Sequence, residues 1–130
     1  MKNKYKVVPI LNVVIIYLDR EDGSQEITVI DLEDLGPVLS YSGRWHAINH
    51  KSTGLTYARG GDHYYGNRPL LHRYIMNPHR GQNTSHYNGN GLDCRRKNLC
   101  NVLIGETARG SRKVSNILSK LTWLYLKIRN

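Results

Sequence analysis

The chain contains few cysteines, few acidic residues and no long apolar run, and each shortage excludes a class of protein. Its two cysteines, Cys94 and Cys100, are too few for the disulfide framework of small secreted domains. The longest apolar run, residues 13–18, is far shorter than the roughly 20 residues that span a membrane. No cleavage site of small residues follows that run, so we expect no secretory signal peptide. We therefore expect a cytoplasmic protein without a membrane partner.

Basic residues outnumber acidic ones, 19 against 10, which leaves a net charge of +9 in 130 residues. Such an excess favours a polyanionic partner, because each cation placed against a phosphate releases a condensed counterion. A nucleic acid is therefore the partner that the charge indicates, although a basic ribosomal protein would have the same balance. Hydrophobic residues make up 39% of the chain, enough for a modest core, so the chain as a whole is not expected to be disordered.

The first half of the chain has the pattern of short strands. Residues 5–18 are rich in Val and Ile and residues 26–30 alternate polar and apolar, which predicts a β-hairpin. Asp31 is placed to cap a short helix through Val38, which Gly36-Pro37 would shorten or break. Further strands are predicted over Arg44–Asn49 and Leu55–Ala58.

From Leu70 the pattern changes. Leu70, Leu71, Tyr74 and Ile75 have helical spacing, and Pro78 and Gly81 end that helix. A short extended segment over residues 84–87 leads into the Gly-rich turn of residues 88–91. A further helix is predicted between Leu103 and Leu118, although two glycines weaken it.

The most informative residues lie between Leu70 and Thr107. They include Leu71-His72-Arg73, then Ser85-His86-Tyr87-Asn88-Gly89, and then Leu92-Asp93-Cys94-Arg95 followed by Asn98-Leu99. This order resembles the HNH (ββα-metal) endonucleases of the phage and mobile-intron type. Their pattern is Leu-His-Arg, Pro-x-x-Gly, Asp-His-x-Asn-Gly, Leu-Asp-x-Arg-x-x-Asn-Leu and a helix with a last Asn. The resemblance covers roughly residues 10–107 and is densest from Leu71 to Leu99.

The resemblance implies an α+β fold of two lobes. Residues 1–66 would form an N-terminal β-rich lobe of hairpins and a short helix, and residues 67–120 an HNH ββα lobe. Residues 121–130 would be a C-terminal tail, either the start of a drifted DNA-binding segment or an element that closes the core. The implied gene is that of a phage or mobile element, expressed in a bacterial host cell.

Two residues are implied as catalytic. His86 ends a short strand beside a turn, where a neutral imidazole is suited to take a proton from the water that attacks a phosphodiester. Asn98 corresponds to the central Asn of the family, whose amide bonds across the loop and holds the histidine in place. The activity implied is hydrolysis of double-stranded DNA with one Mg²⁺ or Mn²⁺ ion, and no small-molecule substrate is expected.

The two metal-ligand positions depart from the family pattern. A carboxylate should precede the histidine, and an Asn or His should follow the central Asn by nine positions. Here these residues are Ser85 and Thr107, both neutral hydroxyls, which hold Mg²⁺ poorly. Glu106 is the substitute ligand that a shifted helix register would bring in. Zinc is not expected, because five residues separate Cys94 from Cys100 and no second pair exists.

Phosphate contacts are expected from the cations around the motif, although a solvated face explains any one of them equally well. The residues are Arg68, Arg73, Arg95, Arg96 and Lys97.

Three functional hypotheses stay open, and with them the question whether the protein is an enzyme. The first is an HNH endonuclease, and the second is a non-catalytic DNA-binding descendant of one. The third is a basic structural protein of a ribonucleoprotein, which would prefer structured RNA. The sequence does not indicate an oligomeric state.

Overall fold

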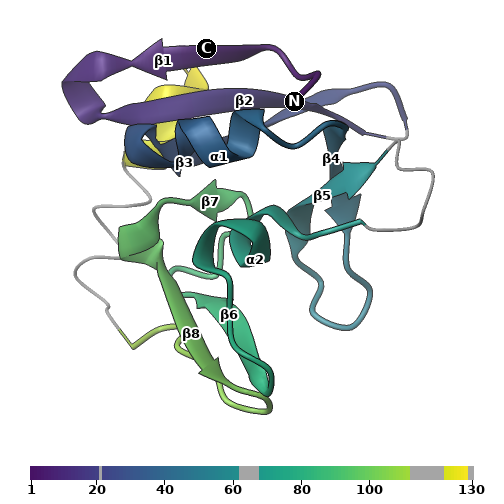
Figure 1. Cartoon of the computed structure of the whole chain (residues 1–130), viewed down its shortest axis with the longest axis vertical. Coiled ribbons are helices and arrows are strands. Elements are labelled where there is room, and N and C mark those ends of the chain that lie inside the picture. Colours follow the sequence, from purple (N-terminus) through teal and green to yellow (C-terminus); the bar gives the residue numbers. More distant parts are fainter. Residues whose placement is uncertain (21, 62–67, 112–121, 129–130) are drawn as a thin grey trace.

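Short strands dominate the protein, as the spacing of its apolar residues predicts. The computed structural model describes residues 1–20, 22–61, 68–111 and 122–128, and it has an α+β architecture of mostly strands (Figure 1). The strands are β1 (Tyr5–Val8), β2 (Val13–Asp19), β3 (Gln25–Asp31), β4 (Arg44–Asn49), β5 (Thr56–Gly61), β6 (Gln82–His86), β7 (Asp93–Cys94) and β8 (Leu99–Leu103). The helices are α1 (Leu35–Leu39) and α2 (Leu71–Met76), with 3-10 turns η1 (Pro9–Leu11), η2 (Leu32–Asp34) and η3 (Arg96–Asn98).

The large sheet is built on the β2–β3 hairpin. Its strand order is β5-β4-β2-β3-β7, and β1 pairs with β2 outside this path. The apolar run of β2 is buried on both faces of the sheet, from Val13 to Ile16, which explains why it lacks polar alternation. The predicted hairpin and the predicted strand over Arg44–Asn49 are therefore confirmed.

A buried carboxamide closes the seam between β2 and β4, where only Asp19 and His46 pair as strand residues. Asn3 donates to the carbonyls of Tyr17 and Trp45, at 2.8 Å each, and accepts the Trp45 N–H at 2.7 Å. These bonds satisfy backbone groups that the incomplete ladder leaves unpaired.

Strand β7 joins the two predicted lobes. It pairs in parallel with β3, Val29 opposite Asp93 and Ile30 opposite Cys94. One buried cluster contains residues from both segments, so the boundary predicted at residue 66 does not separate two cores. In Figure 1, β7 lies between the large sheet and the lower part of the molecule.

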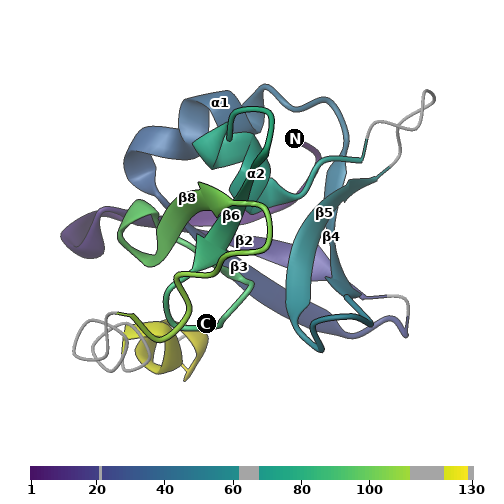
Figure 2. The same ribbon diagram turned by 90° about the horizontal axis from the view of Figure 1, so that it is seen from below.

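A second ladder, β6–β8, carries the residues of the motif. It is antiparallel, with His86 opposite Leu99 and Ser85 opposite Cys100. Seen from below, it stands beside the β4–β5 hairpin (Figure 2). The ladder supplies a pair of antiparallel strands, and the ββα lobe itself stays a prediction. The helix predicted somewhere between Leu103 and Leu118 does not include residues 104–111, which have no helical turn, and residues 112–121 lie outside the described part of the chain.

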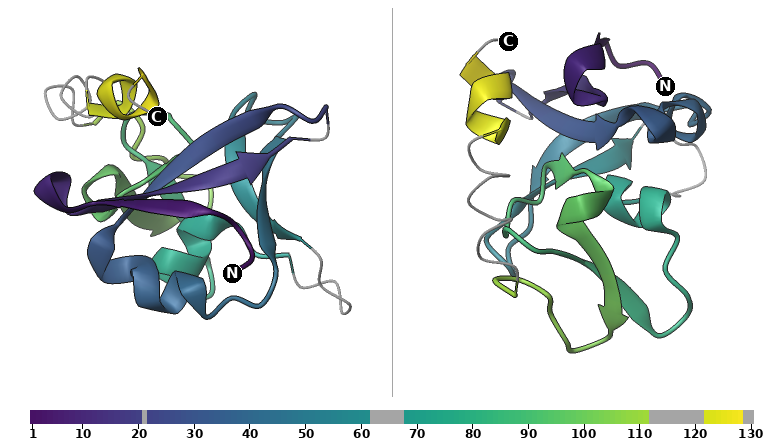
Figure 3. Two further views of the ribbon diagram at one scale, coloured as in Figure 1. Left: turned by 90° about the horizontal axis from the view of Figure 1, so that it is seen from above. Right: turned by 90° about the vertical axis from the view of Figure 1, so that its left-hand side faces the viewer.

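Two further expectations have clear outcomes. Asp31 does not cap a helix through its side chain; its carboxylate accepts the N–H of Arg96 at 2.8 Å. The tail forms a helical segment over residues 122–128 that closes the core, with Trp123 and Leu126 buried (Figure 3). None of the described helices is long and apolar enough to cross a membrane.

The Asn3 bridge yields a test of the fold. Asn3→Ala removes three buried hydrogen bonds, so we expect the free energy of unfolding to fall by about 3 kcal/mol. Asn49→Ala is the matched control, because Asn49 accepts one bond from Thr56 at an exposed site and should cost less than about 1 kcal/mol. Urea titration measures both. Equal losses would contradict the role given to Asn3.

Candidate functional site

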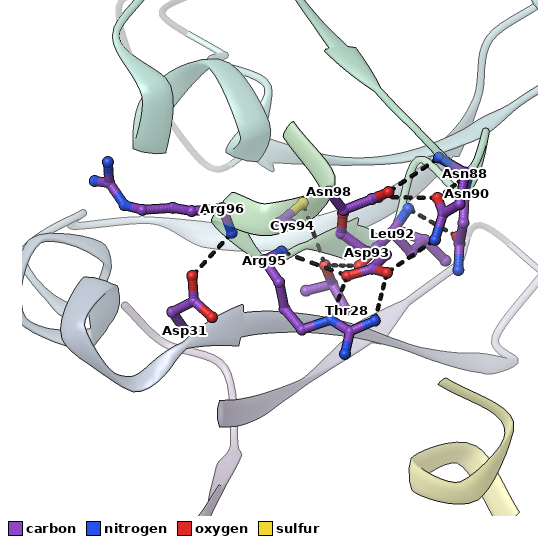
Figure 4. A network of polar contacts seen from close by, with 10 residues as sticks. All are labelled: Thr28, Asp31, Asn88, Asn90, Leu92, Asp93, Cys94, Arg95, Arg96 and Asn98. Atoms are coloured by element: carbon purple, nitrogen blue, oxygen red, sulfur yellow. Dashed lines mark hydrogen bonds and ion pairs between the residues drawn. The ribbon is translucent and has the colours of Figure 1, made fainter. Parts of the chain in front are cut away.

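Asn98 organises the connection between β6 and β8. Its Oδ1 accepts the Asn88 N–H at 3.0 Å, and its Nδ2 donates to the Asn88 Oδ1 and to the Asp93 carbonyl, at 2.9 Å each (Figure 4). The Tyr87 N–H donates to the Asn98 carbonyl at 2.8 Å, directly after His86. The amide thus spans the loop beside the histidine, and any part it has in a reaction stays a prediction.

A buried ion pair lies under this loop. The Arg95 guanidinium makes two bonds of 2.7 Å to the Asp93 carboxylate, and both side chains are within 1% of full burial. Asn88 donates to the same carboxylate at 3.0 Å. The prediction that Arg95 contacts DNA is therefore wrong in this structure, because its charge faces Asp93 inside the core.

His86 ends β6 inside an aromatic cluster. Its ring lies 4.5 Å from that of His72 on α2 and 5.7 Å from that of Tyr57 on β5, centroid to centroid. Only 5% of His86 is exposed, and its Nε2 has no hydrogen-bond partner among the described residues. Burial lowers the pKa of His86 to about 4, so the imidazole is neutral at neutral pH.

His72 shares this environment. Burial, followed by the charges of His86 and Arg73, lowers the pKa of His72 to about 3. Its Nδ1 also lacks a described partner. The Leu-His-Arg motif therefore contributes a second buried neutral imidazole in contact with the first.

The two expected ligand positions lie side by side. Ser85 Oγ and Thr107 Oγ1 are 3.2 Å apart, although 22 residues separate them in the chain. Ser85 Oγ also accepts the Ala108 N–H at 3.0 Å, and Thr107 Oγ1 accepts the Arg109 N–H at 3.1 Å. They line a pocket of about 290 Å³ together with His86 and Glu106. We call it the β6 pocket.

This donor set fits a divalent ion poorly. Among the described residues, the only carboxylate that lines the β6 pocket belongs to the exposed Glu106. The two hydroxyls have four lone pairs, and the three hydrogen bonds at Ser85 and Thr107 use three of them. Mg²⁺ usually takes one or two carboxylates, so the residues at the ligand positions do not match its demands.

Arg109 was not among the predicted site residues. It lines the β6 pocket, and its guanidinium lies over Gly89, where an added Cβ would come within 2.7 Å of Nε. Gly89 has φ +72°, a conformation that favours glycine. The sequence gives one indication that Arg109 belongs to the site, because Arg109 follows the predicted ligand position Thr107 by two residues.

The remaining predicted cations differ in their surroundings. Arg73 donates to the Asn83 side chain at 2.8 Å, and Arg96 pairs with Asp34 at 2.9 Å. Lys97 and Arg68 are exposed, and Arg68 lines a separate groove beside β4 and β5. Arg96 is thus largely an anchor between η3 and the segment before α1.

One acidic cluster has the spacing of a metal site. Carboxylate oxygens of Asp31, Glu33 and Asp34 lie within 4.8 Å of one another. Asp31 accepts the Arg96 N–H, and both Asp34 oxygens accept its guanidinium. The positive charge of Arg96 accounts for this cluster without a metal.

The cysteines lie apart from this chemistry. Cys94 is fully buried in the large sheet, where burial raises the pKa of its thiol to about 12. Cys100 is partly exposed, and both thiols are free. No cysteine belongs to the one potential metal cluster found among the described residues.

Comparison with known proteins adds no relative. No protein-family model, curated protein or solved structure matches the chain.

The buried histidines yield a prediction of pH dependence. Both have a pKa below the usual 6.5 in the folded state, so the unfolded chain binds more protons as the pH falls below about 6.5. Their full contribution to stability is present above that pH and is lost toward pH 4. At pH 5 the expected loss is about 2 kcal/mol for each histidine.

His72→Leu should roughly halve the slope of unfolding free energy against pH between 7 and 5. His79→Leu replaces an exposed histidine and is the control that should leave the slope unchanged. Urea titrations at several pH values measure it. Identical slopes in the wild type and His72→Leu would contradict the assignment.

Proposed function

We propose that the protein binds double-stranded DNA with an HNH-type site whose capacity for metal-dependent hydrolysis is strongly reduced. The observation that carries the proposal is the Ser85–Thr107 contact beside His86. Two positions chosen only from the family pattern lie 3.2 Å apart, next to the histidine that the same pattern assigns as the base.

The charge of the chain supports DNA as the partner. The net charge is +9, and Arg109 and Lys97 are exposed near the ends of β8. Cations on a surface of this kind bind the phosphate backbone without reading base sequence. Sequence-independent, salt-sensitive binding is therefore the expected activity.

The chemistry of the pocket argues against efficient cleavage. A one-metal nuclease needs an ion that polarises the phosphoryl group and stabilises the leaving oxygen. Ser85 and Thr107 offer one unused lone pair between them, and Glu106 supplies the only carboxylate that the described part of the chain places at the pocket. His86, with a pKa near 4, stays neutral but is a weak base.

A second candidate function, slow nicking of DNA, rests on Glu106 and His86. Both line the β6 pocket, and a carboxylate with waters and a DNA phosphate can hold one divalent ion. In this alternative His86→Ala removes all nicking.

Binding and cleavage are measured together. We expect purified protein to retard duplex DNA of any sequence, with an affinity that falls steeply as salt rises, and to leave supercoiled plasmid intact with Mg²⁺ or Mn²⁺. Nicking that disappears in His86→Ala would replace this proposal with the second candidate. A clear preference for structured RNA would contradict both and favour a ribonucleoprotein component.

Restoring the ligands tests the cause of the reduced hydrolysis. Ser85→Asp with Thr107→Asn places a carboxylate and an amide at two positions whose native hydroxyl oxygens lie 3.2 Å apart, so we expect Mn²⁺ binding that calorimetry detects and the wild type lacks. Ser42→Asp, at an exposed site, controls for the added charge. No gain in the double variant relative to this control would contradict the explanation.

A further inference from the structure

We propose that the β6 pocket is a phosphate-binding pocket, in which Arg109 and one hydroxyl of the Ser85–Thr107 pair donate hydrogen bonds to the oxygens of a DNA phosphodiester. The inference rests on the proposed function, because it names the group of the DNA that the site takes. With Ser85 and Thr107 at the two positions where the family has metal ligands, the pocket would then bind an anion instead of a cation.

The hydroxyl pair is organised to donate. Backbone N–H groups of Ala108 and Arg109 already occupy one lone pair on each oxygen. The contact between Ser85 and Thr107 uses one of the two hydroxyl protons, whichever side donates it. The other proton has no acceptor among the described residues, so the pair can offer one O–H to a ligand.

Arg109 supplies the positive charge. Its guanidinium is held over Gly89 at the edge of the pocket, and no carboxylate pairs with it among the described residues. A guanidinium binds phosphate oxygens with two parallel hydrogen bonds. Its backbone N–H also positions Thr107, so charge and hydroxyl are fixed by the same residue.

His86 adds a buried polar atom at the same pocket. Its Nε2 is enclosed and has no described partner, which is costly unless a ligand or water bonds to it. The imidazole is neutral and carries one N–H, so the wall that it forms does not repel an anion as a carboxylate would.

Replacing Glu106 distinguishes a pocket that binds an anion from one that binds a cation. Glu106 lies on the same pocket and is exposed. A carboxylate repels a phosphate but attracts a metal ion. Glu106→Gln should therefore tighten phosphate binding severalfold if the pocket takes an anion, and should abolish Mn²⁺ binding if it takes a cation.

The experiment follows backbone amide signals of the full chain by NMR during titration with dimethyl phosphate and, separately, with Mn²⁺. We expect dimethyl phosphate to shift the amides of Ser85, Thr107 and Arg109. Arg109→Gln should weaken this binding by roughly 10-fold, the loss of one charge-assisted contact, and Arg109→Lys should recover part of it. Arg80→Gln, an exposed arginine outside the pocket, should change nothing.

The same variants are then measured for duplex DNA affinity. Arg109→Gln should weaken DNA binding and lower the slope of log affinity against log salt by about one phosphate contact. If DNA binds but neither Arg109→Gln nor dimethyl phosphate has an effect at the pocket, the phosphate pocket is refuted and the proposed function stands. If dimethyl phosphate binds there and DNA does not bind, the proposed function fails alone. Mn²⁺ binding that Glu106→Gln removes would overturn the inference.

Discussion

The buried carboxylate of Asp93 fixes the loop on which the site depends. Asp93 is a strand residue of the large sheet, opposite Val29, and its carboxylate neutralises Arg95 in the core. Its backbone carbonyl accepts from Asn98, which in turn holds the turn after His86. Removing one partner of a buried ion pair of this kind is costly, because the charge that remains is neither paired nor solvated. The β6–β8 ladder is thereby attached to β7 of the large sheet, which fixes the position of the pocket beside β6.

The chemistry of the pocket follows from the side chains that the loop and β6 place there. A carboxylate at position 85 would present acceptors to a metal, whereas Ser85 Oγ accepts the Ala108 N–H and shares a hydrogen bond with Thr107 Oγ1 in the loop after β8. The loop is closed on the ladder by hydroxyl bonds rather than by an ion. Arg109 lies at the pocket in the same loop, so the pocket has a positive charge beside its hydroxyl pair.

Much of this arrangement could be predicted from the sequence. The alternation and the β-branched runs predicted the hairpin and the strand over Arg44–Asn49, and the resemblance to the HNH pattern assigned Ser85 and Thr107 to one site. The rest depends on tertiary pairing. Local pattern could not reveal that Asp93 and Cys94 join β3, and so it assigned Arg95 to the surface. Arg109 was missed because the glycine that admits its guanidinium lies 20 positions away in the chain.

A crystal structure of the protein with a short DNA duplex and Mn²⁺ tests the central claim most directly. The account predicts a DNA phosphate within hydrogen-bond distance of one hydroxyl of the Ser85–Thr107 pair and of the Arg109 guanidinium, with no anomalous manganese signal in the β6 pocket. A manganese ion bound between Glu106 and the hydroxyl pair, or a duplex bound on another face of the molecule, would contradict it.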